Sequence, residues 1–346
     1  MTAGSHDRAD DIIVPVSPAA GKETLAMLMG IFEAARVVPR AVATVSLPLT
    51  IVSGFLGSGK TTLVNRLLSE PGGRRIAVLV NDFAAVNIDE ELIRFQSEDT
   101  IGLTNGCACC SINGDLVNAI QRLIERKEPP DAIVLEASGL ADPRGIAQVA
   151  LANPAIRLDA ILTLVDCETF PERIRDERTR PTMLAQLSAA DIVVMSKSDL
   201  IEDRLDAIKG LIESSVPGRA ILEAMHGNIP ANIVLGVNAG PSFAFGCSAA
   251  DHHTSFASTT RSWSTPIQRD VITRALRELP QNIIRAKGIF CFKDDDQRRF
   301  VYQRVGKRES LEAAPELSSI AQHGSRLVLI GFSEQWDEAE VSRLIP

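Results

Sequence analysis

The chain has 346 residues, a formal net charge of −8 and charged side chains at 23% of its positions. This length is sufficient for two domains with substantial hydrophobic cores. The negative charge argues against a general nucleic-acid-binding protein, which normally presents a basic surface. No apolar run reaches the roughly 18–20 residues that a membrane-spanning helix requires.

Residues 1–46 carry no chemical motif and are expected to form a mobile N-terminal extension. Asp7, Asp10 and Asp11 precede the first apolar residues, so the start of the chain lacks the basic-then-apolar pattern of a secretory signal. Of the six cysteines, three fall within four residues, which indicates metal or thiol chemistry rather than a disulfide framework. Together these features predict a cytoplasmic protein.

The first predicted strand, 47–53, leads into the segment GFLGSGKTT at residues 54–62. This segment matches the phosphate-binding loop pattern G-x-x-x-x-G-K-[ST], and the strand before it and the helix predicted at 60–69 are the context that such a loop requires. Backbone N–H groups and the helix N-terminus would bind phosphate, Lys60 would reach the β- and γ-phosphates, and Thr61 would hold Mg²⁺. The residues predicted to bind a nucleoside triphosphate are Gly54, Gly57, Ser58, Gly59, Lys60, Thr61 and Thr62.

Strands and helices alternate after this loop. The predicted strands are rich in Val, Ile and Leu and lie at 75–81, 132–136, 160–166 and 191–196. The predicted helices lie at 114–126 and 143–151. Uninterrupted apolar strands are typical of parallel sheets covered on both faces. The pattern predicts an α/β, doubly wound, mostly parallel domain over residues 47–235, with its ligand at the carboxyl ends of the strands.

The strand at 132–136 ends in Glu136, and Gly139 follows three residues later. An acidic residue at such a strand end can hold Mg²⁺ through water, and the glycine allows a backbone N–H to reach the γ-phosphate. Alone this pattern is weak, because many buried strands end in Glu. After a phosphate-binding loop, Glu136 and Gly139 are expected to complete the catalytic site with Lys60.

The strand at 191–196 runs into Ser196, Lys197 and Asp199, a form of the [NTS]-K-x-D pattern. The aspartate of this pattern accepts hydrogen bonds from guanine N1–H and N2–H₂, and the lysine stem lies along the base. Adenine presents no such pair of donors, and a carboxylate left unpaired in the pocket would cost about 1–3 kcal/mol. The sequence therefore favours GTP over ATP, although Ser196 replaces the usual Asn.

Three closely spaced thiols, Cys107, Cys109 and Cys110, lie between the second and third predicted strands. Thiolates suit Zn²⁺ or a similar divalent ion, with an open position for a nitrogen, oxygen or water ligand. Structural cysteines or a redox pair are the alternatives. His252 and His253, in the polar stretch that follows the first domain, could pass metal to this loop or could simply be solvated.

That polar stretch, rich in Gly, Ser and Ala, is expected to be a linker at 236–262. A smaller α+β domain is predicted at 263–346, with a helix beginning at Thr265-Pro266 and a last helix beginning at Glu334. The short strands expected for its antiparallel sheet lie at 288–293, 300–305 and 326–330.

In this order the motifs resemble those of the CobW-type P-loop GTPases, relatives of the UreG and HypB nickel-insertion proteins. The motifs are GFLGSGKTT, NDFAAVNID, NGCACC, LEASGLADP and SKSD, and RAKGIF and RLVLIGF resemble the family's C-terminal domain. The resemblance runs from about residue 47 to the end. It implies GTP hydrolysis coupled to delivery of zinc or cobalt to a client protein, with the three cysteines holding the transported ion. It also implies that Asp82, in the switch segment, orients water or Mg²⁺.

Two departures from the family pattern predict weaker or narrower metal buffering. Ala84-Ala85 stand where members often carry Gly-Glu, and the linker holds His252-His253 where many members have a long histidine run. The resemblance implies a client metalloprotein docked on the C-terminal domain and a nucleotide-dependent homodimer, with no nucleic-acid or membrane partner. The alternatives within the family are a dedicated activator of one metalloenzyme, of the nitrile hydratase type, and a cobalt protein of the cobalamin pathway. Outside it, an ATP-dependent kinase or ligase and a nucleotide-gated binding module remain open.

Overall fold

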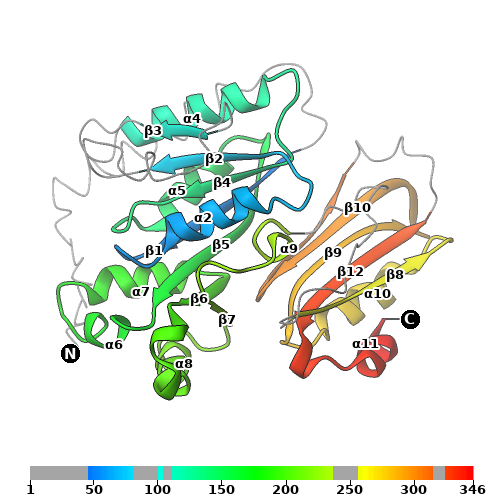
Figure 1. Cartoon of the computed structure of the whole chain (residues 1–346). Helices are drawn as coiled ribbons and strands as arrows, with labels where there is room; N and C mark the ends of the chain where they lie inside the picture. The colour runs from blue at the N-terminus through cyan, green and yellow to red at the C-terminus, as the bar shows by residue number, and fades with distance from the viewer. Residues whose placement is uncertain (1–45, 82–99, 104–110, 237–255, 315–323, 346) are drawn as a thin grey trace, which may run out of the picture.

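The computed structural model describes residues 46–81, 100–103, 111–236, 256–314 and 324–345. The sequence predictions that fall outside these residues concern the N-terminal extension, Asp82, Ala84-Ala85, the cysteines at 107, 109 and 110, and the histidines at 252 and 253. Within the described part, the chain forms a larger α/β unit and a smaller unit built on a second sheet (Figure 1).

Seven parallel strands form the larger sheet, in the order β3-β2-β4-β1-β5-β6-β7. The strands are β1 (Leu47–Gly54), β2 (Ile76–Asn81), β3 (Thr100–Leu103), β4 (Ala132–Glu136), β5 (Ile156–Asp166), β6 (Ile192–Ser196) and β7 (Ala220–Ala224). This sheet confirms the predicted doubly wound class. The two edge strands, β3 and β7, were not predicted, because β3 has only four residues and an exposed Glu223 interrupts the apolar run of β7.

Helices cover both faces of this sheet. They are α2 (Lys60–Ser69), α4 (Ser111–Ile124), α5 (Pro143–Leu151), α6 (Phe170–Arg173), α7 (Arg180–Ala189), α8 (Leu205–Ser215) and α9 (Ala231–Val234). Successive residues of β1 point to opposite faces, so Val52 joins the core under α2 while Ile51 joins the core under α4 and α5. The helices α6, α7, α8 and α9 were not predicted. In α7, the three buried residues are too sparse to give a clear apolar stripe.

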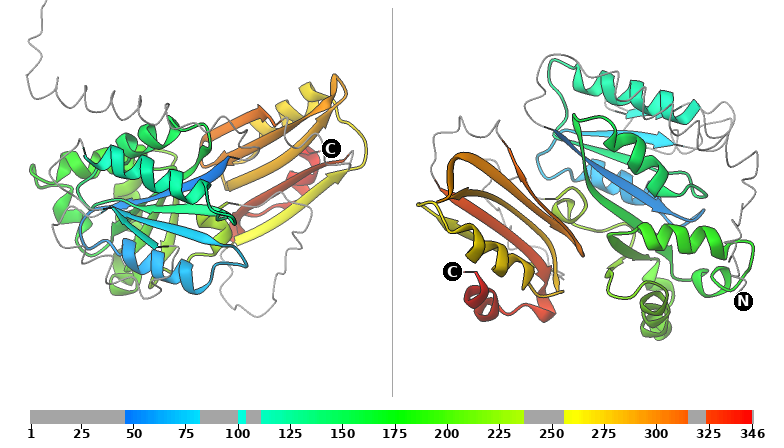
Figure 2. Two further views of the ribbon diagram at one scale, coloured as in Figure 1. Left: turned by 90° about the horizontal axis from the view of Figure 1, so that it is seen from above. Right: turned by 180° about the vertical axis from the view of Figure 1, so that it is seen from behind.

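Five antiparallel strands form the second sheet, in the order β11-β10-β9-β12-β8. The strands are β8 (Phe256–Trp263), β9 (Ile283–Phe292), β10 (Asp295–Val305), β11 (Arg308–Ala313) and β12 (Ser325–Phe332). The helices α10 (Arg269–Arg277) and α11 (Glu338–Leu344) pack on the face turned away from the larger unit (Figure 2). This arrangement confirms the smaller α+β unit.

Several boundaries in the second unit differ from the prediction. β9 and β10 each begin five residues earlier than expected, at Ile283 and Asp295, and β11 was not predicted. β8 begins at Phe256, inside the stretch assigned to the linker, and its burial alternates along the strand as expected at a sheet edge. α10 begins at Arg269 rather than at Thr265-Pro266, because Ile267 pairs with the end of β9 through an N–H donated to Cys291 O at 3.0 Å. Glu334 lies in a short 3₁₀ turn, and α11 begins only after Asp337, whose side chain caps it.

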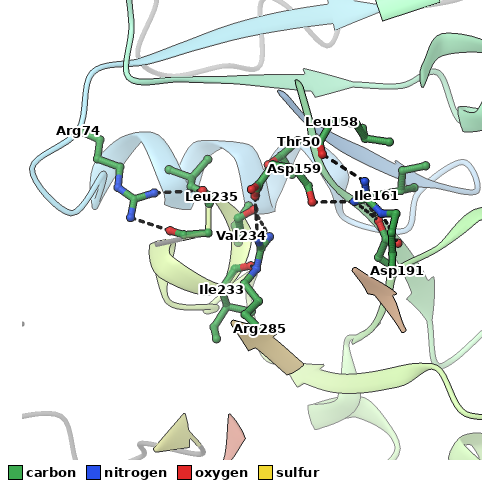
Figure 3. Close-up of polar contacts among 12 residues, drawn as sticks. Thr50, Arg74, Leu158, Asp159, Ile161, Asp191, Ile233, Val234, Leu235 and Arg285 are labelled. Carbon is green, nitrogen blue, oxygen red and sulfur yellow. Dashed lines mark hydrogen bonds and ion pairs between the residues drawn. The ribbon is translucent and has the colours of Figure 1, made fainter. Parts of the chain in front are cut away.

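The two units share one hydrophobic core and a buried ion pair. Ile284 of β9 and Val328 of β12 pack into the same cluster as Val64 of α2. Beside this cluster, Arg285 donates from Nη1 to Asp159 Oδ2 at 2.7 Å, with both side chains almost fully buried (Figure 3). None of the helices in the described part of the chain is both long and apolar enough to cross a membrane.

Candidate nucleotide site

The phosphate-binding loop connects β1 to α2 through glycines that no other residue could replace without strain. Gly54 has φ +141°, and a Cβ at this position would lie 2.4 Å from the backbone oxygen of Leu164. Gly57 and Gly59 have φ +76° and +90°, and Gly59 caps the start of α2. These conformations turn the backbone sharply before the helix, as a phosphate-binding loop requires.

Lys60 is buried inside this loop. Its side chain is 7% exposed, and Nζ donates to Gly54 O at 3.0 Å and to Phe55 O at 3.3 Å. The ammonium is therefore held along the concave side of the loop by neutral carbonyls. Phosphate oxygens are charged acceptors and bind an ammonium more strongly than carbonyl oxygens do, so Lys60 is suited to the β- and γ-phosphate role predicted for it.

Thr61, in the first turn of α2, contacts Glu136, at the end of β4. The Thr61 hydroxyl donates to Glu136 Oε1 at 2.7 Å, and Glu136 is 1% exposed. A hydroxyl and a carboxylate are the hard oxygen donors that suit Mg²⁺, so the two residues fit the ion predicted at this place. The pairing also shows that the end of β4 lies directly beside the first turn of α2, which brings the residues predicted from separate motifs together.

The loop that follows Glu136 lies against the phosphate-binding loop. A Cβ at Gly139 would meet the Leu56 side chain at 2.5 Å and the Leu56 backbone nitrogen at 2.8 Å. Gly139 is therefore glycine because the two loops approach closely. On its other side, the buried Gln186 of α7 donates from Nε2 to Gly139 O and to Ala141 O, both at 3.1 Å. The sequence analysis did not identify Gln186, whose contact has no local sequence signal.

The residues predicted to read the base lie at the end of β6. Lys197 has φ +57°, and its Nζ forms an ion pair with Asp166 at 2.9 Å. Asp199 lies in the following 3₁₀ turn, Ser198–Leu200. Among the hydrogen bonds and ion pairs between described residues, none involves the Asp199 carboxylate, so it can accept bonds from a ligand. Asp166, at the end of β5, was missed; a strand that ends in Asp was the available signal.

Ser196 ties the base-reading turn to the phosphate-binding loop. Its hydroxyl lies 2.7 Å from Ser58 O and 3.1 Å from Val165 O. The residue that replaces the usual Asn thus supplies a short contact to the phosphate-binding loop. This contact sets the separation between the phosphate and base ends of the site.

A loop after β7 crosses the first turn of α2. His226 has φ +51°, and a Cβ at the next residue, Gly227, would lie 3.0 Å from the Leu63 backbone. His226 and Lys197 are the two non-glycine residues with positive φ among the described residues. Both follow adjacent strands at the same edge of the sheet, where strained backbone commonly accompanies ligand sites. The sequence analysis did not predict this loop.

The strands that precede the remaining predicted residues in sequence are neighbours in the larger sheet. Asp82 follows β2, and the three cysteines follow β3, although these residues lie outside the described part of the chain. β2 is the neighbour of β4, and β3 is the neighbour of β2. Within the described residues, no group of three or more His, Cys, Asp and Glu side chains could hold a metal ion.

Two family models match the chain and divide it near the boundary between the two sheets. The model described as "CobW/HypB/UreG, nucleotide-binding domain" matches residues 48–223. The model described as "Cobalamin synthesis protein cobW C-terminal domain" matches residues 256–344. The second match begins at the first residue of β8.

Curated relatives are similar over most of the chain. "Zinc chaperone CobW" of Pseudomonas aeruginosa is 31% identical over 340 residues, covering 86% of this chain and 90% of that protein. "Zinc chaperone YjiA" of Escherichia coli is 27% identical over 317 residues, covering 85% and 96%. Among solved structures, the Zn(II)-bound YjiA GTPase of E. coli aligns with 86% of this chain and 98% of its own at 21% identity, with a TM-score of 0.39.

Proposed function

This chain belongs to the CobW/HypB/UreG family of P-loop GTPases, and we propose that it couples GTP hydrolysis to the delivery of a divalent metal ion to a client metalloprotein. The cargo would bind at Cys107, Cys109 and Cys110. Relatives from P. aeruginosa, Sinorhizobium and E. coli are all named zinc chaperones, which favours Zn²⁺ over Co²⁺. We place this cycle in the cytoplasm, where thiols stay reduced.

The nucleotide chemistry rests on the residues that the fold gathers at one edge. Lys60 binds the β- and γ-phosphates from inside the loop, and Asp199 accepts the guanine N1–H and N2–H₂ donors. Thr61 and Glu136 would hold Mg²⁺, which would neutralise phosphate charge. Asp82 orients the attacking water. Because Asp199 makes no bond to another described residue, a base without those donors would leave its carboxylate unpaired, which favours GTP.

The observation that carries the coupling is the strand order. β3, β2 and β4 are consecutive neighbours, and adjacent strands lie about 4.8 Å apart. The loop that carries the cysteines therefore starts about 10 Å from the end of β4, where the terminal phosphate would act. The strand that precedes Asp82 in sequence, β2, lies between β3 and β4. A rearrangement of the Asp82 segment on hydrolysis could alter the thiolate spacing directly, which a metal-release step needs.

The test is a metal competition titration of the reduced full chain with Zn²⁺ and Co²⁺, in the presence of GMPPNP or GDP. The variant Cys107→Ala/Cys109→Ala/Cys110→Ala is compared with the control Cys167→Ala/Cys291→Ala, which removes two buried cysteines. We expect tight binding that is lost in the first variant, kept in the control and different between nucleotides. Thiol deprotonation should make the affinity rise with pH near neutrality.

Equal metal affinity in both nucleotide states would contradict the coupling, since a ligand without differential affinity shifts no equilibrium. Metal binding that survives in the triple variant would instead assign the cargo site elsewhere. A parallel competition between GTP and ATP, with Asp199→Ala, tests the kinase or ligase alternative. Loss of two hydrogen bonds to a charged acceptor should weaken GTP by about 100-fold or more and leave ATP almost unchanged.

The client partner is the remaining part of the proposal. We propose that it docks on the C-terminal unit, because the loops of the larger unit that would bind nucleotide must stay free to change shape. A dedicated activator of one metalloenzyme differs from a general zinc chaperone in this partner alone. Co-purification of the full chain with its client, with GMPPNP and then with GDP, distinguishes them by how many partners are recovered.

A further inference from the structure

Gln186 is a buried polar side chain that the nucleotide chemistry described above does not use. It lies on α7, outside every motif, and is 2% exposed. Its Nε2 group donates to two backbone oxygens of the loop after β4, those of Gly139 and Ala141, each at 3.1 Å. One side-chain amide therefore satisfies two carbonyls on either side of Leu140.

The loop that Gln186 contacts is anchored at its two ends, where Ala137 N donates to Val52 O at 2.9 Å and Asp142 caps α5, but its middle is held less directly. Gly139 has no side chain to restrict its dihedral angles, and the Leu140 side chain is 47% exposed. The internal bond from Ala141 N to Ser138 O, at 3.0 Å, closes a turn but does not fix that turn relative to the sheet. The two bonds from Gln186 tie it to a helix packed on the sheet.

The backbone of Gln186 is itself held by β5, the strand that ends in the ion-pair partner of Lys197. The Thr163 hydroxyl of β5 donates to Gln186 O at 3.0 Å. Three residues later β5 ends in Asp166, the ion-pair partner of Lys197. Gly139, whose carbonyl Gln186 binds, also lies against Leu56 of the phosphate-binding loop. Gly139 thus lies between the Gln186 amide, which binds its carbonyl oxygen, and the phosphate-binding loop.

We propose that Gln186 is a positioning residue for the terminal phosphate. By holding Gly139 O and Ala141 O it fixes the turn that Ala141 N closes on Ser138 O, and this turn orients the Ser138–Gly139 peptide, whose N–H would contact a γ-phosphate that GDP lacks. The proposal rests on the assignment of Gly139 to the γ-phosphate. It makes α7 part of the switch, since releasing the amide would free the loop without touching the nucleotide.

The experiment measures the affinity of the full chain for GMPPNP and for GDP, together with kcat and KM for GTP. Gln186→Met keeps the size of the side chain and removes both donors. Gln186→Asn keeps the donors on a stem one carbon shorter. Gln148→Met, on the exposed face of α5, is the matched control. Thermal unfolding of each variant establishes that it is folded.

We expect Gln186→Met to weaken GMPPNP by about tenfold, the effect of losing one hydrogen bond to the phosphate, and to lower kcat. GDP affinity should stay within about twofold, because GDP has no group that reaches Gly139. Gln186→Asn should give an intermediate GMPPNP affinity, and Gln148→Met should resemble the parent chain. If Gln186→Met does not fold, the intermediate loss with Gln186→Asn carries the same test.

Equal losses for GMPPNP and GDP, or no loss for either, would overturn the proposal and leave Gln186 a structural residue. Failure of the assigned nucleotide function is a separate result. In that case the parent chain itself would not discriminate GMPPNP from GDP or would not hydrolyse GTP, whatever stands at residue 186.

Discussion

At the scale of single residues, the phosphate-binding loop depends on the absence of a side chain at Gly54. Gly54 approaches the backbone of β5 so closely that a Cβ would overlap the Leu164 carbonyl at 2.4 Å and the Ser58 hydroxyl at 2.6 Å. The first contact is with backbone in the middle of a parallel sheet, which cannot move aside without breaking strand pairing. The motif glycine therefore serves packing as well as phosphate binding.

We expect Gly54→Ala to lower the free energy of unfolding by about 1–3 kcal/mol, as overpacking and positive φ combine. Urea denaturation of the full chain measures the change. Gly73→Ala is the control, because Gly73 also has positive φ, at +76°, but a Cβ there would meet nothing within 4 Å. Similar losses at the two positions would show that φ alone, rather than the approach to Leu164, limits residue 54.

At the scale of elements, α5 converts the loop after Glu136 into a fixed structure. Asp142 caps the helix by accepting the backbone N–H of Arg144 at 3.0 Å, and Pro143 occupies the first turn. The helix was predicted to begin at residue 143, and the Asp-Pro pair at its start is a local signal for a cap and a first turn. The contact of the same loop with Gln186 was not predicted, because 45 or more residues separate the partners.

Asp142→Ala should therefore destabilise the chain by about 1 kcal/mol through loss of the cap. The measurement is the midpoint of urea unfolding at pH 7. Asp142→Asn, which keeps an oxygen acceptor for the N–H, should recover most of this stability. If Asn proved as harmful as Ala, the ion pair with Arg144, rather than the cap, would be the stabilising interaction.

At the scale of the whole molecule, a buried ion pair between charged side chains joins the two units. Arg285 of β9 contacts Asp159 of β5 and the backbone oxygens of Ile233 and Val234 (Figure 3). The two charged groups are 3% and 4% exposed. Burial opposes ionisation of Asp159, but the neighbouring Arg285, Lys287 and Arg157 outweigh it and lower the pKa of the carboxyl.

Removing one partner of this pair leaves the other charge buried alone. Arg285→Met should lower the free energy of unfolding by about 3–5 kcal/mol and separate the unfolding of the two units in calorimetry. Arg261→Met is the control, because its partner Glu338 is 52% exposed and such pairs contribute at most about 1 kcal/mol. A loss at Arg285 no larger than at Arg261 would mean that the shared apolar core alone joins the units.

Lys287, beside this pair on β9, makes the interface sensitive to pH. Burial and the nearby Arg157 lower the pKa of Lys287 from 10.5 to about 8, against the opposing effect of Asp159. Arg74 and Arg285 also face it and act in the same direction as Arg157. The unfolded chain therefore binds this proton more tightly than the native chain does, so the charge destabilises the fold below pH 8.

Lys287→Met should accordingly raise the melting temperature at pH 7, and its advantage over the parent chain should shrink as the pH rises from about 8 to 10.5. Melting curves of both proteins across this range provide the measurement. The difference between the two proteins removes the contribution of other titrating groups. An advantage that is constant with pH would mean that packing, not the charge, causes it.

What the sequence determined by itself is local. The GFLGSGKTT loop, the alternation of strands with helices, Glu136 at a strand end and the Lys197–Asp199 turn are all patterns of neighbouring residues, because backbone conformation and apolar periodicity act over a few residues. Only the tertiary structure decided the strand order and the ion pair of Lys197 with Asp166. It also decided the contact of Gln186 with Gly139 and the ion pair between the two units, Arg285 with Asp159. Arg285 and Asp159 are 126 positions apart, and such pairs leave no periodic trace, since only the packing of whole elements brings them together.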